Sequence, residues 1–167
     1  DVSGSYSLQD AGYCGQISAT LTISDNHHCL DTAPSNTINI NRPPSVSSVT
    51  ITQPNACDGT IYYDGTFTDC DGTSNVDWEV AFSDGGSVFG QGSPFSGSYQ
   101  LQQYSSFCGN LQATLTVTDD QGCKDTMTSN TVDVNQRPSI TSVTLTQPDP
   151  CEYTIGYTAA FSDCDGL

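Results

Sequence analysis

A long internal repeat is the feature that most constrains this chain. Residues 50–54 (TITQP) return as residues 144–148 (TLTQP), and the two segments begin 94 positions apart (144 − 50 = 94). At the same offset, residues 67–72 (FTDCDG) return as residues 161–166 (FSDCDG). A fixed period of this length is typical of tandem copies of one small domain. The sequence therefore predicts an array that supplies length and spacing rather than catalysis.

The repeat divides the chain into three parts. Residues 43–136 form one complete unit, residues 1–42 correspond to the second half of a unit, and residues 137–167 correspond to its first third. A unit of this size can fold as an independent domain. We expect neither end part to build a whole core alone, which indicates a window of a longer array or, as the alternative, copies that complete one another. Prolines in the joints 41–44 and 135–138 favour closely strung units.

The cysteine and charge content indicates an extracellular or cell-surface protein. Eight cysteines follow the repeat, with spacings of 15, 28 and 13 on both sides of a spacing of 38, and no C-x-x-C motif occurs. This pattern favours disulfides in an oxidising compartment. Three basic residues against nineteen acidic ones give a formal charge of −16, which excludes a phosphate-neutralising nucleic-acid surface. No apolar run is long enough for a membrane span.

Apolar and polar residues alternate along much of the chain, as half-buried strands require. Asp-Gly and Gly-Gly pairs separate the alternating segments and favour turns, and no segment carries a helical stripe. About seven short strands per unit predict an all-β sandwich. The clearest predicted strands cover residues 49–51, 61–67, 76–82, 99–101, 113–117 and 132–134.

The alternation also predicts which side chains build the core. These are Tyr63, Phe67, Trp78, Leu115 and Val117. A second interpretation of Trp78 is a platform for sugar binding. Other aromatic residues fall in stretches without alternation, where we expect them to pad the ends of the sandwich or to form contacts between units. They are Phe89, Phe95, Tyr104 and Phe107.

Several motifs of the complete unit resemble the PKD repeat family. They are residues 69–72 (DCDG), 76–80 (VDWEV), 83–86 (SDGG) and 113–122 (ATLTVTDDQG). The chain departs from the family at residues 81–85 (AFSDG), where PKD repeats commonly have Phe-Gly-Asp-Gly, and in its four cysteines per unit. The resemblance implies tandem immunoglobulin-like sandwiches in extracellular multi-domain proteins such as surface layers, adhesins and secreted-enzyme spacers. It implies no reaction.

An immunoglobulin-like sandwich suggests a disulfide pairing. Cys57 and Cys70 bracket the second strand, and thirteen extended residues span about 40 Å, which is too far for a disulfide. Cys108 and Cys123 bracket the sixth strand in the same way. In such a sandwich the second and sixth strands lie in opposite sheets and run in the same direction. We therefore predict the pairs Cys57–Cys108 and Cys70–Cys123, one at each end, each stabilising the domain by about 2–4 kcal/mol.

The end units hold the other four cysteines. By the same rule, Cys14 and Cys29 are expected to find partners in a preceding unit. Cys151 and Cys164 are expected to find partners in a following unit.

Acidic turns at one end of the sandwich suggest a calcium site. Asp69 and Asp71 follow the second strand, and Asp119 and Asp120 follow the sixth, so the topology brings both turns together. Clustered carboxylates without basic neighbours suit a hard cation. The alternative is that these aspartates only favour and solvate the turns. We expect no other cofactor.

Outward-facing threonines are candidate sites for O-linked glycans, although exposed threonine is ordinary in strands. The candidates are Thr20, Thr22, Thr114, Thr116 and Thr118. No catalytic motif is present: the sequence contains no G-x-S-x-G, no phosphate loop and no H-E-x-x-H. The pair His27-His28 corresponds to Gln121-Gly122, which favours a solvated turn over a metal site. We predict that the protein is not an enzyme.

Together these observations predict a structural repeat of an extracellular fibre, stalk or surface layer, built from disulfide-stapled domains stacked end to end. Its partners would be neighbouring repeats or other copies of the chain, with glycans as further partners. The alternative is an adhesin or carbohydrate-binding spacer of a secreted multi-domain protein. A third interpretation is a spacer stiffened by calcium.

Overall fold

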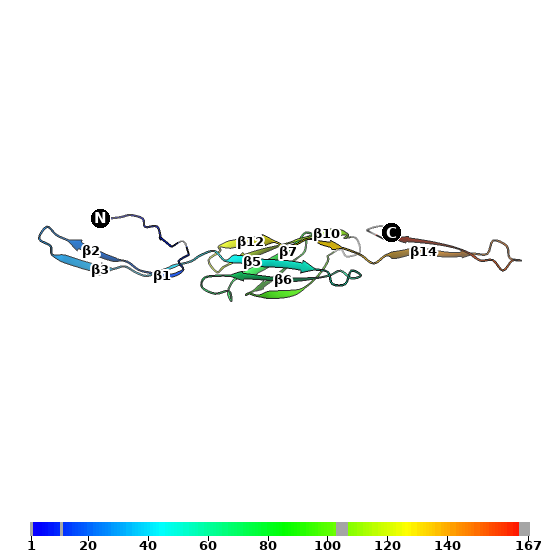
Figure 1. Ribbon diagram of the computed structural model, residues 1–167, viewed down its shortest axis with the longest axis horizontal. Helices are drawn as coiled ribbons and strands as arrows, with labels where there is room; N and C mark the ends of the chain where they lie inside the picture. Colours follow the sequence, from blue (N-terminus) through cyan, green and yellow to red (C-terminus); the bar gives the residue numbers. More distant parts are fainter. Residues whose placement is uncertain (1, 11, 103–106, 164–167) are drawn as a thin grey trace.

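Every regular element of the described chain is a β-strand, which confirms the all-β prediction. The computed structural model describes residues 2–10, 12–102 and 107–163. Figure 1 shows an elongated molecule in which a central sandwich separates an N-terminal arm from a C-terminal arm. None of the described residues belongs to a helix that could span a membrane.

The central sandwich consists of two antiparallel sheets and one short ribbon. One sheet has the order β5-β6-β9, and the other has the order β12-β11-β7-β8. The ribbon β10-β13 extends the β11–β12 hairpin away from its turn. The strands are β5 (Ser45–Thr52), β6 (Thr60–Thr68), β7 (Asp77–Phe82), β8 (Ser87–Gln91), β9 (Phe95–Gln100), β10 (Gly109–Leu111), β11 (Ala113–Thr118), β12 (Lys124–Thr128) and β13 (Val132–Val134).

The core lies between the two sheets because each central strand buries every second side chain. In β6 and β11 the apolar positions are buried, and the residues between them are exposed or half-buried on the opposite face. All five residues predicted for the core are buried, which confirms that prediction. Trp78 stacks on Phe95 with ring centroids 4.3 Å apart. With 8% of its surface exposed, Trp78 is a core residue and not a surface platform for sugars.

The two arms are hairpins that repeat the strand pairings of the sandwich. In the N-terminal arm, Thr20 pairs with Pro34, as Thr114 pairs with Thr128 in the sandwich, 94 positions later (114 − 20 = 94). The C-terminal arm copies the β5–β6 hairpin, including an irregularity after its second residue. The arm strands are β1 (Gly15–Ile17), β2 (Thr20–Ser24), β3 (Leu30–Pro34), β4 (Ile38–Ile40), β14 (Ser139–Thr146) and β15 (Gly156–Ser162).

Candidate functional site

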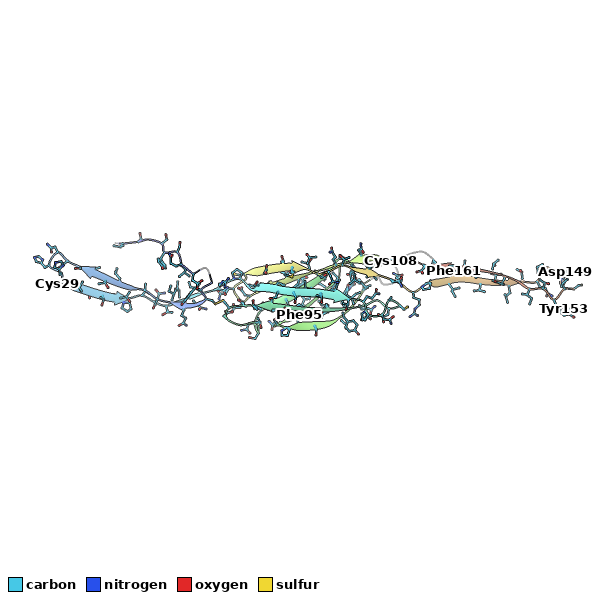
Figure 2. The ribbon with its side chains drawn as sticks, in the orientation of Figure 1. Cys29, Phe95, Cys108, Asp149, Tyr153 and Phe161 are labelled. Carbon is cyan, nitrogen blue, oxygen red and sulfur yellow. A yellow bond between two sulfur atoms is a disulfide. The ribbon has the colours of Figure 1, made fainter. Side chains whose placement is uncertain are left out.

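The cysteines and acidic turns of residues 43–136 lie at the two ends of the sandwich, where the arms join it. We call the end beside the N-terminal arm the N-terminal junction, and the opposite end the C-terminal junction. Figure 2 shows Cys108 at the C-terminal junction and Cys29 at the outer tip of the N-terminal arm. The N-terminal junction contains Cys14, Asn41, Cys70, Asp119 and Cys123, and the C-terminal junction contains Cys57, Cys108, Asn135 and Arg137.

A disulfide crosses the N-terminal junction. Cys14, just before β1, is bonded to Cys70, just after β6, with Cα atoms 6.0 Å apart and a sequence separation of 56. The bond therefore ties the N-terminal arm to the sandwich. Closing a loop of this length stabilises the linked state by about 4 kcal/mol in the chain-entropy description.

This bond corrects the predicted pairing within a unit. Cys70 is joined to Cys14, so the predicted pair Cys70–Cys123 is wrong, and Cys14 does not need a partner in a preceding unit. The predicted pair Cys57–Cys108 is also wrong, because Cys108 is disulfide-bonded while Cys57 is a free thiol. The physical reason is position. These cysteines lie in exposed or half-exposed positions beyond the strand ends. At the N-terminal junction, Cys70 and Cys123 contact Cys14 and Asn41 of the arm rather than each other.

Four cysteines of the described residues are free thiols in this structure. They are Cys29, Cys57, Cys123 and Cys151. The predictions that Cys29 and Cys151 pair with neighbouring units stay open. Cys164 lies outside the described residues.

An aspartate cap and an asparagine hold the N-terminal junction together. One carboxylate oxygen of Asp119 accepts the backbone N–H groups of Gln121 and Cys123, at 2.9 and 2.7 Å. The other accepts the side-chain amide of Asn41, from the joint, at 2.6 Å. Burial raises the pKa of Asp119, but the hydrogen bonds from Asn41, Cys123 and Gln121 outweigh it, so the pKa lies below its usual value. Asp119 is therefore engaged in holding the turn and the joint.

The same turn occurs in the N-terminal arm, where no neighbouring unit of the described chain lies against it. Asp25 accepts the backbone N–H groups of His27 and Cys29 at 2.8 and 2.9 Å. Asp25 is exposed, whereas Asp119 retains only 6% exposure. His27 and His28 are exposed turn residues. The predicted solvated turn is confirmed for this pair.

Three of the four predicted calcium ligands surround one small polar hollow. Asp69, Asp71 and Asp120 line a space of about 40 Å³ together with Asn75. One carboxylate oxygen of Asp69 is buried there without a hydrogen-bond partner. The fourth predicted ligand, Asp119, lies close enough to act on Asp69 electrostatically but is committed to the cap.

The electrostatics of this hollow disfavour an ionised Asp69. Burial is the main cause that raises the pKa of Asp69, and the carboxylates of Asp71, Asp119 and Asp120 raise it further, against a hydrogen bond from the Cys70 amide. Asp69 and Asp71 could also share a cation with the Cys70 sulfur on distance alone, since their ligand atoms lie within 4.8 Å. That sulfur is already in the disulfide. The hollow therefore offers oxygen ligands, which suit calcium.

The C-terminal junction is held by hydrogen bonds between the joint and the β5–β6 connection. The side chain of Gln53 exchanges hydrogen bonds with the backbone of Asn135 at 3.2 and 3.3 Å. The side-chain amide of Asn135 donates to the carbonyl of Ala56 at 3.4 Å. Arg137 donates to the carbonyl of Cys57 at 3.4 Å. Sequence reasoning identified the cysteines but missed these amide contacts, for which the recurring Asn of both joints was the available signal.

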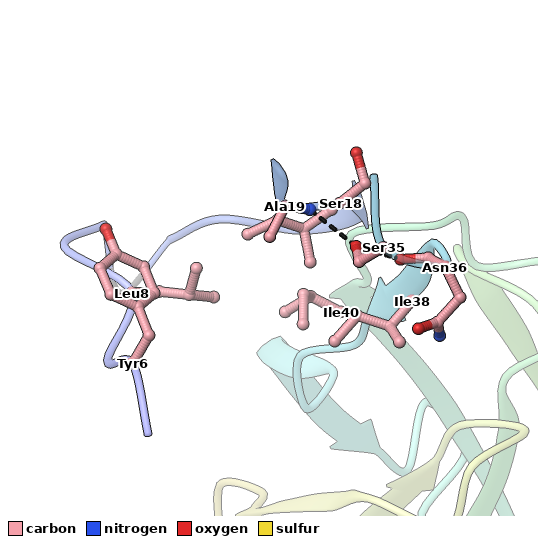
Figure 3. A pocket seen from close by; sticks show the side chains of 9 residues that line it. Tyr6, Leu8, Ser18, Ala19, Ser35, Asn36, Ile38 and Ile40 are labelled. Carbon is pink, nitrogen blue, oxygen red and sulfur yellow. Dashed lines mark hydrogen bonds between the residues drawn. The ribbon is translucent and has the colours of Figure 1, made fainter. Parts of the chain in front are cut away.

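An open hollow of about 620 Å³ lies in the N-terminal arm, where Figure 3 shows Tyr6 and Leu8 facing Ile38 and Ile40. It does not resemble a ligand site, because Ile17 and Ile40 of its lining, from β1 and β4, correspond to core positions of the sandwich. Ile17 and Ile40 are the counterparts, 94 positions earlier, of Leu111 and Val134, which are 0% and 1% exposed (111 − 17 = 94). In the arm, β1 and β4 form a two-stranded sheet, and Ile17 and Ile40 are only half-buried.

The threonines proposed for glycosylation differ in exposure. Thr20 and Thr22 in the arm and Thr114 in the sandwich are exposed, whereas Thr116 and Thr118 are half-buried. The three exposed side chains are open to modification.

Comparison with known proteins identifies no family for this chain. No protein-family profile matches the chain, and no curated protein matches it. The PKD resemblance therefore stays a prediction. One solved structure is similar, a crystal structure of a tetra-tandem repeat in the extending region of a large adhesion protein, with 17% identity and a TM-score of 0.39. The alignment covers 90% of this chain and 45% of that one.

Proposed function

We propose that this chain is a structural repeat of an extracellular fibre, stalk or surface layer, in which disulfide-linked sandwiches follow one another end to end. Its task is mechanical extent, and it performs no catalysis. The partner of each unit is the next unit, either further along one polypeptide or in another copy of the chain.

The observation that carries this proposal is the covalent link between successive units. The Cys14–Cys70 disulfide joins residues that the repeat assigns to two different units. The hydrogen bond from Asn41 to Asp119 crosses the same junction. A flexible spacer needs neither contact. A cross-linked junction restricts bending between neighbours, which favours a stiff rod. A disulfide on the protein surface also favours an oxidising, extracellular setting.

A second candidate, a calcium-stiffened spacer, is favoured by the buried and unpaired carboxylate oxygen of Asp69. Asp69 and Asp71 follow β6, whereas Asp120 lies in the β11–β12 turn. A bound cation would therefore connect the two sheets beside the N-terminal junction. No calcium is required for the main proposal.

Electron microscopy and small-angle scattering test the main proposal. We expect native material in negative stain to form regular filaments whose axial repeat equals one domain length. We also expect the Cys14→Ser chain to show a broader distribution of lengths in scattering than the unchanged chain, with Cys29→Ser as the matched control. A monomeric rod that binds one glycan class on an array would instead support the adhesin alternative. Extension that disappears with a chelator would support the calcium spacer.

A further inference from the structure

We propose that each junction contains a second disulfide between repeats, which joins Cys57 of one repeat to the cysteine at the Cys123 position of the next repeat. The proposal rests on the end-to-end array proposed above and identifies the cysteines that link its repeats covalently. The structure itself contains the first inter-repeat disulfide, Cys14–Cys70.

The two joints carry equivalent asparagines, and each shows one side of the proposed contact. Asn41 and Asn135 are 94 positions apart (135 − 41 = 94). The side-chain amide of Asn41 lies 3.6 Å from the Cys123 sulfur of the following unit. The side-chain amide of Asn135 lies 3.4 Å from the carbonyl of Ala56 in its own unit, directly before Cys57. In a junction between two complete units, the asparagine of the joint would therefore contact the segment of Cys57 in one unit and the cysteine at the Cys123 position in the next.

The state of the cysteines follows their position in the repeat. Cys14, Cys70 and Cys108 are disulfide-bonded. The free thiols occupy two other positions: Cys29 is the counterpart of Cys123, and Cys57 is the counterpart of Cys151, each pair being 94 apart. These two positions are the ones that the first disulfide leaves unused, and they lie on opposite ends of a unit.

The arms do not contain the required partners. Cys123 faces the N-terminal arm, whose residues 1–42 include no counterpart of Cys57. Cys57 faces the C-terminal arm, whose residues 137–167 include no counterpart of Cys123. Cys57 and Cys123 should therefore both be free thiols in this chain, as they are.

Distance and chemistry both permit the bond. A disulfide requires Cα atoms about 4.4–6.8 Å apart, and the Cys14–Cys70 pair, at 6.0 Å, shows that cysteines of adjoining units reach this range. Cys57 is exposed and Cys123 is half-buried. Forming the bond removes two protons and two electrons from two thiols. A small-molecule or protein disulfide accepts them by exchange and is itself reduced to two thiols.

An extended chain tests the proposal. Because Leu167 corresponds to residue 73, adding a copy of residues 74–136 after Leu167 completes the second unit and places a copy of Cys123 beyond Cys57. The chain is oxidised with a glutathione couple, its free thiols are alkylated, and it is digested at acidic pH, where exchange is slow. We expect one peptide pair that links Cys57 to the added copy of Cys123, beside the Cys14–Cys70 pair as an internal standard.

A matched control uses the same substitution in two places. Cys123→Ser in the original unit should leave the new linked peptide intact, and the same change in the added copy should abolish it. Cys57→Ser should abolish it as well. The proposal is overturned if Cys57 is fully alkylated while the Cys14–Cys70 link is intact, or if Cys57 is linked to Cys70 or Cys108.

Native material provides a second measurement if the extended chain does not fold. The same peptide map should contain a Cys57 peptide linked to a peptide from the Cys123 position, and a fully alkylated Cys57 would overturn the proposal. Failure here is distinguishable from failure of the proposed function. Filaments with an alkylated Cys57 would refute only the second disulfide, whereas a linked Cys57 in material without filaments would refute only the fibre.

Discussion

The sandwich and the arms contain nearly the same strands in two different environments. Leu115 in β11 is fully buried, whereas its counterpart Leu21 in β2 is 60% exposed. Phe67 in β6 is 2% exposed, whereas its counterpart Phe161 in β15 is 54% exposed. Figure 2 shows Phe161 on the narrow C-terminal arm and Phe95 inside the thicker sandwich.

The difference separates what a strand pair needs from what a domain needs. Each hairpin finds its register in both environments, since pairing depends on local alternation and turn chemistry. Burial depends on the second sheet, which only residues 43–136 provide in this chain. An isolated two-stranded hairpin is at best marginally stable in water. The disulfide and the hydrogen bond from Asn41 to Asp119 give the N-terminal arm contacts that its hairpin alone does not provide.

The largest expected effect comes from removing the same side chain in each environment. Leu115→Ala opens a cavity in the core and should lower the free energy of unfolding of the sandwich by about 3 kcal/mol. Leu21→Ala removes an exposed side chain and should change it by less than about 0.5 kcal/mol. Denaturant titration followed by the fluorescence of Trp78, the only tryptophan, measures the sandwich directly. Equal effects of the two changes would show that the arm is buried in solution.

Most of the sandwich was predictable because its inner strands alternate cleanly. The sequence missed the edge strands β8 and β12, which have no fully buried residue and therefore no strong apolar period. It also placed Phe95 and Phe89 in loops. Both lie in strands: Phe95 is buried in β9, and Phe89 is 69% exposed on β8. Phe107 packs partly against the core, and Tyr104 lies outside the described residues.

A glycine explains why the sequence predicted only the end of β9, in the strand 99–101, and not its start at Phe95. The alternation from Phe95 to Tyr99 is interrupted at Gly97, where an apolar residue would complete the pattern. A Cβ atom at Gly97 would lie 2.4 Å from the hydroxyl oxygen of Tyr63. The position must stay empty so that Tyr63 can cross it. A packing constraint from another strand thus removed the signal that sequence analysis relies on.

The candidate site was less predictable than the fold. The sequence correctly grouped Cys70 with Cys123, and Asp69 with Asp120, at one end of the sandwich. It could not assign the disulfide, because pairing depends on the relative placement of two units. Alternation within one unit contains no information about that placement. The recurring asparagine of the joints was visible, but only its contacts reveal its role.

A second glycine gives a medium effect that again distinguishes sandwich from arm. A Cβ atom at Gly90 would lie 2.3 Å from the Trp78 ring, so Gly90→Ala should displace the ring from its stack and lower the free energy of unfolding by about 1–3 kcal/mol. Gly4→Ala in the N-terminal arm is the control, since nothing lies within 4 Å of its added Cβ atom. Thermal unfolding monitored by near-ultraviolet circular dichroism reports both. A Gly90→Ala chain as stable as the original would contradict the observed packing.

The smallest effect concerns the acidic hollow, and its sign follows from the raised pKa of Asp69. Because the folded chain holds the Asp69 proton more tightly than the unfolded chain, ionised Asp69 destabilises the fold at neutral pH. This cost should disappear as the pH falls through the raised pKa toward the unfolded value of 3.8. The lowered pKa of Asp119 acts in a separate window: its stabilisation is lost only as the pH falls below 3.8.

Calcium and protons should therefore substitute for each other at Asp69. Since the site is near the surface, we expect the gain on acidification from neutral pH to be below about 1 kcal/mol. Asp69→Asn should remove this gain and also remove any rise in Tm with calcium at neutral pH. Asp25→Asn in the N-terminal arm changes an aspartate far from the hollow and should leave both intact. Calorimetric melting curves between pH 7 and 4, with calcium or with a chelator, measure these shifts. If calcium leaves the Tm of the unchanged chain constant at pH 7, the aspartates only stabilise the turns in which they lie. The junction then depends on its disulfides and asparagines.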